Sequence, residues 1–448
     1  MNRMCYLIGL DIGTSSVKGV LMTDSGKIAK TANKSFDYER LENGIVQIDA
    51  DKFVSACYSA IAELSEGKSV SGICAASASG NLLILDKDNK PITPIISWQD
   101  KRVTNEGTEV LGEVDKDELY DLIGWPSSLK ALPLAQLCYI KKHQPEILEN
   151  CGMACMSTEY LYYTLTGKWG ISTSAGTPSC LINQKTGKYI TEFLDKLGIS
   201  ENQLPPVLPQ GTVLGRASDK AAGLCGLDKE TSVVLGTFDH PSAARGSGVL
   251  NEGDMLFSLG TSWVAFLPVK SREKIVKSGA LIDPFLSPEG CFGAMVSVSS
   301  VSVGIKKYLT RYIDNSSKAV EILNDLASKS VSGANGLTIN PLNEPDDELI
   351  GKYPKEDIAR AIMEGTVRLL KEKLERLENF GISAKSAKVV GGPSEGFMWI
   401  NILKEMLKIP IFAVQGSVTG AVGAAIMAGI GIGVYKNEWE ALKIIKKD

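Results

Sequence analysis

The first forty residues alternate short apolar runs with turn residues, which is typical of β-strands. The runs LIGLDIG (7–13) and VKGVLMTD (17–24) flank a Gly-Thr-Ser turn, and the Asp-Ser-Gly turn at 24–26 precedes a third run. Asp/Gly turns between apolar runs connect antiparallel neighbours. The pattern therefore predicts a three-stranded antiparallel meander.

The periodicity then changes from that of a strand to that of a helix. In residues 51–67, Phe53, Cys57, Ile61 and Leu64 recur at helical spacing. The apolar run SGICAAS (71–77) follows and predicts another strand. Strands and a helix thus alternate along the chain, which indicates an α/β fold.

One long stretch, residues 409–435, contains no charged residue and has to be tested as a membrane span. It divides at QGSVTG (415–420) into the strand-like run IPIFAV (409–414) and a helix rich in small residues. Pro410 and several glycines also lie within it. We interpret it as a buried strand and helix of a protein that does not enter a membrane.

An internal repeat is the most informative pattern in the chain. Residues 12–22 read IGTSSVKGVLM and residues 259–269 read LGTSWVAFLPV, so a Gly-Thr-Ser triplet begins at Gly13 and again at Gly260. Each triplet lies between two strand-like runs near the start of one half of the chain. The repeat predicts a duplication into two similar domains.

A Gly-Thr-Ser turn between strands suits phosphate binding. Glycine allows a ligand to approach the backbone, and successive N–H groups and hydroxyls form an anion-binding concavity. Two such turns, one in each domain, would hold a polyphosphate from both sides. The alternative for each is an ordinary hairpin turn.

The charge balance excludes several classes of partner. The chain has 48 Lys and Arg against 52 Asp and Glu, for a net charge of −4. This balance provides no basic surface for nucleic acid and no polybasic patch for a membrane. We expect neither as a partner.

The cysteines and the amino terminus predict a cytoplasmic protein. The nine cysteines are scattered and the only histidines are His143 and His240, so neither a disulfide framework nor a zinc site is expected. The apolar run before Asp11 is too short for a signal peptide.

Eight segments together resemble the FGGY carbohydrate kinases of the actin-like ATPase superfamily. They occur in the family's order from Tyr6 to Tyr435. The segments are DIGTSSVK (11–18), PIISWQDKR (94–102), STEYLYYTLTGKW (157–169), AGT (175–177), GTFDHPSAARGSG (236–248), SLGTSW (258–263), VVGGPSEGFMW (389–399) and TGAVGAAIMAG (419–429).

This resemblance implies an α/β protein with two actin-like, ribonuclease-H-like domains and a nucleotide cleft between them. Residues 1–242 would bind the sugar and carry the first phosphate turn, and residues 243–448 would carry the second phosphate turn and the adenosine site. The implied activity is ATP-dependent phosphorylation of a hydroxyl of a ketose or related carbohydrate. ATP and Mg²⁺ are the implied cofactors, a small-molecule sugar is the partner, and a homodimer is left open.

Two aspartates carry the implied chemistry. The resemblance makes Asp239 the general base that accepts the proton of the attacking sugar hydroxyl, with a helix N-cap as the alternative role. Asp11 would help to organise Mg²⁺ near the phosphates through water. Its alternative role is to cap a turn.

The resemblance also places residues on the nucleotide. Relatives often have Ser or Asn in place of Gly396, so adenine selectivity is open. The small-residue helix 419–429 resembles the family's closing segment or serves only tight packing. The nucleotide-side residues are Gly13, Thr14, Ser15, Lys18, Gly260, Thr261, Gly391, Gly392 and Gly396.

The sugar side is less regular. Where pentulose kinases usually carry Gln-Met-His, this chain has Ala-Ser-Gly at 78–80, so the sugar's identity is open. Asp100 and Arg102 have a structural pairing as their alternative role, and His240 either contacts the sugar or belongs to the core. The segment 339–357 is shorter than in relatives. The sugar-side residues are Ser79, Gly80, Asn81, Trp98, Asp100, Arg102, Asp239 and His240.

Three alternatives to a sugar kinase stay open. A kinase of glycerol or a tetritol would use the same machinery. A non-metabolic actin-like ATPase would keep both phosphate turns without needing the segment 98–102 or Asp239. A degenerate sugar-binding protein would account for the altered residues 78–81.

Overall fold

The computed structural model describes residues 5–126, 129–260, 262–286, 288, 290–316, 318–349, 351–414, 416 and 418–445. The chain forms two compact units. The first unit comprises Met1–Gly248 with Val418–Asp448, and the second unit comprises Val249–Ser417.

These units differ from the predicted division after residue 242. Helix α10 (Asp239–Ser247) runs on past that point, and the C-terminal helices α16 (Thr419–Gly431) and α17 (Glu438–Ile445) pack against the first sheet. The assignment of the sugar to residues 1–242 and of adenosine to residues 243–448 stays a prediction.

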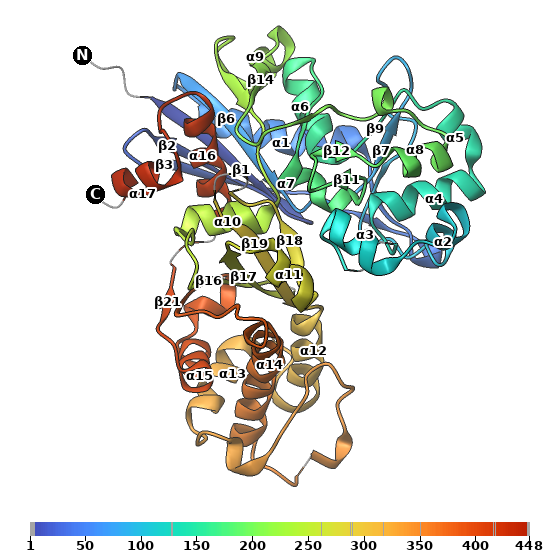
Figure 1. The fold of residues 1–448 in the computed structure, drawn as a ribbon. Helices are drawn as coiled ribbons and strands as arrows, with labels where there is room; N and C mark the ends of the chain where they lie inside the picture. Colours follow the sequence, from blue (N-terminus) through green and yellow to red (C-terminus); the bar gives the residue numbers. More distant parts are fainter. Residues whose placement is uncertain are drawn as a thin grey trace. The chain divides into compact units, whose positions relative to one another are not determined.

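The first unit is built on a six-stranded sheet of order β14-β15-β6-β1-β2-β3 (Figure 1). The predicted meander is confirmed, because β1 pairs antiparallel with β2 and β2 with β3, while β6 and β15 continue the sheet parallel to β1. The strands are β1 (Tyr6–Ile12), β2 (Ser16–Thr23), β3 (Ile28–Ser35), β6 (Val70–Ser77), β14 (Val213–Arg216) and β15 (Ser232–Val234).

The second unit repeats this arrangement in its own six-stranded sheet, of order β18-β19-β17-β16-β20-β21. Here β16, β17 and β19 form the antiparallel meander, and β20 and β21 run parallel to β16. The shared strand order supports the duplication inferred from the Gly-Thr-Ser repeat. The strands are β16 (Asp254–Leu259), β17 (Trp263–Val269), β18 (Leu281–Asp283), β19 (Phe292–Val298), β20 (Ser386–Val390) and β21 (Ile411–Ala413).

Helices cover both sheets, and in the first unit a further group of helices and short strands forms a second apolar core. The helices of the first unit are α1 (Ala50–Ser65), α2 (Glu106–Leu111), α3 (Lys116–Ile123), α4 (Pro133–His143), α5 (Pro145–Glu149), α6 (Ser157–Thr166), α7 (Thr173–Gly176), α8 (Thr191–Leu197) and α9 (Asp219–Cys225), with α10, α16 and α17. Its short strands are β4 (Glu39–Arg40), β5 (Val46–Ile48), β7 (Leu83–Leu85), β8 (Ile95–Ile96), β9 (Met153–Cys155), β10 (Ile171–Ser172), β11 (Ile182–Asn183), β12 (Lys188–Tyr189) and β13 (Val207–Leu208). The second unit has α11 (Arg272–Ser278), α12 (Val301–Tyr308), α13 (Ala319–Ser328), α14 (Lys355–Glu378) and α15 (Phe397–Leu407).

Strand β1 divides the core of the first unit into two layers. Ile8, Leu10 and Ile12 face the layer of α1 and α6, whereas Leu7 faces the layer of α16 and α17. Alternate residues of a strand point to opposite faces, so Asp11 lies on the α16 side. The face that receives the C-terminal helix is thus the face that carries this carboxylate.

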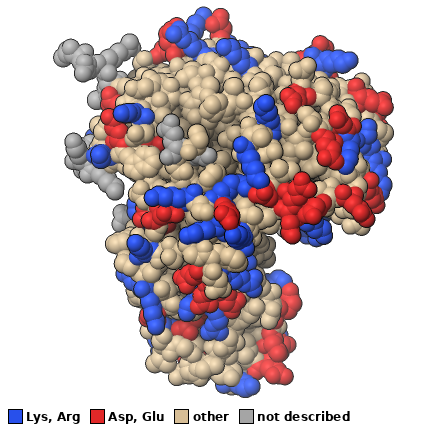
Figure 2. All heavy atoms as spheres, in the orientation of Figure 1, with Lys and Arg blue, Asp and Glu red and all other residues tan. Residues whose placement is uncertain are grey.

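The charge-free stretch 409–435 forms β21 and α16, the predicted strand and helix, but the prediction of a buried strand is wrong, because Phe412 and Ala413 of β21 are exposed. Helix α16 is buried and has 13 residues, so it is about 20 Å long, less than the ~30 Å core of a bilayer. Among the described residues, no helix combines the length and the apolar character that membrane crossing requires. On the face shown in Figure 2, basic and acidic side chains are interspersed.

Glu159 is fully buried at the start of α6, where its Oε2 accepts a hydrogen bond from the Met156 N–H at 3.1 Å. Within the described residues its Oε1 has no hydrogen-bond partner. Burial raises the pKa of this carboxyl from 4.5 to about 8. The folded state therefore holds the proton more tightly than the unfolded state does.

The stability that Glu159 contributes is fully present below about pH 4.5 and is lost progressively as the pH rises from there to about 8. We expect Glu159→Gln, which keeps the acceptor and cannot ionise, to remove this loss. The melting temperature of the wild type should fall relative to that of the variant between about pH 4.5 and about pH 8, and the difference should level off above that pH. Parallel melting curves over this range would show that Glu159 is not the titrating group.

Candidate active site

Two aspartates meet at one end of the first sheet. Asp11 lies near the end of β1, and Asp239 follows β15 at the first position of α10. The parallel strands β1, β6 and β15 end on this side, and a further bridge joins Ser77 of β6 to Phe238. The carboxyl edge of a parallel sheet is where α/β proteins place their functional groups.

Asp11 is surrounded by groups that act on its charge in opposite directions. Its cross-strand neighbour on β2 is Lys18, and a Cβ placed on Gly420 would lie 2.4 Å from its Oδ2. Burial and the nearby Asp239 raise the pKa of Asp11 to about 7, against the opposing effect of Lys18. A cation beside Asp11 would relieve the repulsion between the two carboxylates.

Asp239 is the first residue of α10, and the N-cap position is occupied by Phe238. The alternative prediction that Asp239 is the N-cap is therefore wrong, because Asp239 lies one position inside the helix. Its side chain keeps 25% exposure, and its Oδ1 accepts a hydrogen bond from the His240 N–H at 2.7 Å. A partly exposed carboxylate in the first turn of a helix is favoured by the helix dipole and stays open to a ligand.

His240 lies beside this carboxylate, with its Nε2 3.9 Å from Asp239 Oδ1. The rings of His240 and Phe238 meet edge-on, with their centroids 5.6 Å apart. The centroids of the Phe238 and Trp125 rings are 6.3 Å apart. Trp125 and Phe238 were not selected from the sequence. The sequence does not predict this row of three rings, because the rings meet only when the segment after α3 folds against the start of α10.

The first Gly-Thr-Ser turn closes through a hydrogen bond from the Gly13 N–H to the Ser16 carbonyl, at 2.9 Å. Thr14 and Ser15 are exposed. The atom nearest to a Cβ added to Gly13 would be 3.6 Å away, so the protein itself has room for a side chain there.

The second turn is hydrogen-bonded to the start of α12. The Gly260 N–H donates to the Ser262 carbonyl at 3.3 Å, and the Ser302 hydroxyl donates to the Gly260 carbonyl at 2.7 Å. The Ser300 N–H donates to the Ser262 hydroxyl at 3.3 Å. Thr261, predicted as a phosphate-side residue, lies outside the described residues.

The three predicted adenosine-side glycines have different environments within the second unit. Gly391 has φ of +101° and its Cβ would meet the Leu259 carbonyl oxygen at 2.4 Å, so only glycine fits. This contact places Gly391 beside the end of β16, where the second turn begins. Gly392 is open, and a Cβ on Gly396 would meet the Asn324 side chain at 2.8 Å.

On the predicted sugar side, Trp98 is 41% exposed and lies beside Gly80, whose φ is +91°. Ser79 is buried and donates to the Ser77 carbonyl at 3.3 Å. Asn81 is also buried, and its amide bonds both the hydroxyl and the N–H of Ser157, at 3.0 and 2.7 Å. Contact of Ser79 or Asn81 with a sugar stays a prediction.

Asp100 is 2% exposed, and both of its carboxylate oxygens accept hydrogen bonds. Arg102 donates to it from its backbone N–H, Nε and Nη2, and Val46 donates its N–H, with distances of 2.9–3.1 Å. This geometry accords with the structural pairing given above as the alternative role. The Arg102 guanidinium also lies over the ring of Tyr139, 5.8 Å from its centroid.

Metal binding would rely on few protein ligands. Within the described ranges, no group of three or more His, Cys, Asp or Glu side chains is placed to hold a metal ion. Asp11 offers a carboxylate oxygen near the Gly13 turn. Such a sparse donor set suits Mg²⁺, which usually binds one or two carboxylates together with waters and phosphates.

The chain is similar to known kinases over nearly its whole length. Residues 6–246 match the model of the FGGY family of carbohydrate kinases, N-terminal domain. The chain is 24% identical over 455 residues to the xylulose kinase of Bacillus subtilis (strain 168), covering 97% of this chain and 90% of the relative. It is 27% identical over 461 residues to the L-xylulose/3-keto-L-gulonate kinase of Escherichia coli (strain K12), covering 98% and 91%.

A solved structure is similar in fold. The crystal structure of gluconate kinase from Lactobacillus acidophilus matches with a TM-score of 0.87 and 20% identity, over 99% of this chain and 92% of the other. This likeness confirms the expected two-domain α/β fold.

Proposed function

This chain belongs to the FGGY family of carbohydrate kinases, and we propose that it transfers the γ-phosphoryl group of ATP to a hydroxyl of a ketose or related carbohydrate, with Asp239 as general base. The observation that carries the proposal is the meeting of Asp239, Asp11 and the Gly13 turn at one edge of the first sheet. The proposed base and the proposed phosphate-side turn thus lie at the same edge of one sheet.

In the proposed reaction the sugar hydroxyl oxygen forms a bond to the γ-phosphorus as the bond from that phosphorus to the β-phosphate oxygen breaks. Asp239 accepts the hydroxyl proton. The Gly13 and Gly260 turns would hold phosphate oxygens with backbone N–H groups and hydroxyls. Mg²⁺, when bound near Asp11, would neutralise charge on the phosphates.

The sugar itself is the open part of the proposal. Small residues at 78–80 stand where pentulose kinases present larger ones, and Gly80 is buried next to the exposed Trp98. The two curated relatives named above are kinases of xylulose and of related keto sugars. We propose a ketose or sugar derivative that differs from D-xylulose in its C1 to C3 region.

An ADP-release screen with ATP, Mg²⁺ and a panel of ketoses, aldoses, polyols and sugar acids tests this proposal. Sugar-dependent release with a ketose other than D-xylulose supports it. A best rate with D-xylulose would overturn the substrate proposal, and a best rate with glycerol or a tetritol would favour a polyol kinase. Sugar binding without turnover would favour a binding protein, and ATP hydrolysis independent of any sugar would favour a non-metabolic ATPase.

Trp98 provides a separate test of the sugar side. Trp98→Ala removes an exposed ring that would pack against the C–H face of a sugar, so we expect the KM for the sugar to rise about tenfold with the KM for ATP unchanged. Trp439→Ala is the matched control, because Trp439 of α17 is exposed to the same 41%. An equal effect of both variants, or an effect on ATP alone, would remove Trp98 from the sugar site.

A further inference from the structure

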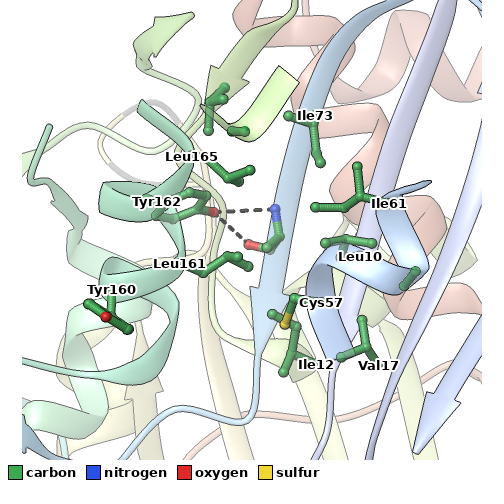
Figure 3. Packing of buried hydrophobic residues seen from close by; sticks show 14 of the residues in the cluster. Leu10, Ile12, Val17, Cys57, Ile61, Ile73, Tyr160, Leu161, Tyr162 and Leu165 are labelled. Carbon is green, nitrogen blue, oxygen red and sulfur yellow. Dashed lines mark hydrogen bonds between the residues drawn. The ribbon is translucent and has the colours of Figure 1, made fainter. Parts of the chain in front are cut away.

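Strands β6 and β15 separate before they reach the site. Their parallel ladder ends at the pair Val234 and Cys74, and the next backbone bridge between the two segments joins Phe238 to Ser77. At this interruption the Tyr162 hydroxyl, from α6, bonds to the backbone of β6 (Figure 3). Asp239 follows the bridge by one residue.

The Tyr162 hydroxyl joins the two strands at this point. It donates to the Ala75 carbonyl at 2.9 Å, and it accepts from the Ala75 N–H at 3.3 Å and from the Gly236 N–H at 2.9 Å. A hydroxyl has one proton to donate and two lone pairs, so its hydrogen-bonding capacity is used in full. Tyr162 is 2% exposed, and burial raises its pKa well above the ordinary value.

The segment that Tyr162 holds packs directly against β6. A Cβ on Gly236 would lie 1.9 Å from the Ala75 carbonyl oxygen. The Ser172 hydroxyl donates to the Gly236 carbonyl at 2.7 Å, and the Ser174 hydroxyl accepts from the Phe238 N–H at 3.3 Å. Both polar groups of Gly236 are thus bonded to side chains from the segment 162–174.

We propose that Tyr162 is a positioning residue for phosphoryl transfer: its hydroxyl holds Gly236 against β6 and so sets where the Asp239 carboxylate stands. This inference rests on the proposed function, because it requires Asp239 to act as the base. Only two residues separate Gly236 from Asp239. A displacement of Gly236 is therefore transmitted to the carboxylate with little chain to absorb it.

Tyr162→Phe tests the proposal in the full-length protein. The variant keeps the ring in the core and removes only the bonds to Ala75 and Gly236. A misplacement of about 1 Å in a catalytic group lowers the rate by up to about 10²-fold, so we expect kcat to fall by about 10- to 100-fold. The KM values for ATP and sugar should stay within about threefold of the wild type, because Tyr162 lies behind the strand end and not among the proposed binding residues.

Tyr58→Phe is the matched control. The Tyr58 hydroxyl donates to the Thr164 carbonyl at 3.0 Å, so this change also removes a tyrosine hydroxyl that bonds near α6 but leaves Gly236 untouched. We expect its kcat to match that of the wild type. Hydrogen exchange in the peptide 234–240 should become faster in Tyr162→Phe and not in Tyr58→Phe.

Each outcome decides the proposal. Equal losses of kcat in the two tyrosine variants, or a wild-type kcat in Tyr162→Phe, would overturn the proposal for Tyr162. The proposed function would still stand in that case if Asp239→Asn is inactive. A fully active Asp239→Asn would overturn both. If Tyr162→Phe does not fold, Ser172→Ala takes its place, because it removes the bond to the Gly236 carbonyl; a wild-type kcat in that variant would overturn the proposal.

Discussion

Asp239→Asn lowers the kcat of sugar phosphorylation by about 10²- to 10⁴-fold, the usual contribution of general-base catalysis. The amide keeps the size of the side chain and an oxygen that can accept the His240 N–H, but it cannot take the proton from a sugar hydroxyl. Steady-state assays of ADP release measure the loss. ATP binding, followed by calorimetry, should be unchanged.

Asp219→Asn is the matched control for this experiment. Asp219 is also the first residue of a helix, α9, and it is exposed at 83% of its side chain. Both changes remove a negative charge from the first turn of a helix, so both alter the helix dipole interaction alike. If Asp239→Asn keeps a turnover within about threefold of Asp219→Asn, Asp239 is not the base.

Gly423→Ala destabilises the first unit. Helix α16 packs against α10 so closely that a Cβ on Gly423 would lie 1.8 Å from the Ser242 carbonyl oxygen, a backbone atom that no rotamer change can move. Overpacking of this kind costs about 1–3 kcal/mol or more, so we expect the melting temperature to fall by on the order of 10 °C. Thermal unfolding followed by circular dichroism measures it.

Gly223→Ala is the control for Gly423→Ala. Gly223 lies within α9, is exposed, and has no atom within 4 Å of an added Cβ. Alanine is a better helix former than glycine by up to about 1 kcal/mol, so Gly223→Ala should keep or raise the melting temperature. An unchanged melting temperature in Gly423→Ala would show that α10 and α16 do not pack as closely as described.

The sequence predicted the elements of the fold well because their signals are local. The alternation of Ile8, Leu10 and Ile12 and the turns after β1 and β2 are written within a few residues, and they gave the meander that the structure confirms. The Gly-Thr-Ser turn occurs twice in the sequence, so the duplication could be inferred from the sequence alone. The two six-stranded sheets support that inference.

Contacts between distant residues were not predictable in the same way. Asp100 matches a sugar-binding pattern, yet its oxygens bond Arg102 and the Val46 N–H, and only the fold brings Val46 to it. Asn81 likewise bonds Ser157. A polar side chain near a site binds either a ligand or the protein, and its neighbours across the chain determine which.

By itself, the sequence determined the α/β class, the duplicated strand-turn-strand, the family resemblance and Asp239 as the leading candidate base. Only the tertiary structure decided that α16 packs on the first sheet beside Asp11, and that Tyr162 holds the strand end before Asp239. The physical reason is that periodicity and turn chemistry act between neighbours in the chain. Close packing and buried hydrogen bonds depend on which distant surfaces fit together, as the Gly423 contact and the Tyr162 hydroxyl show.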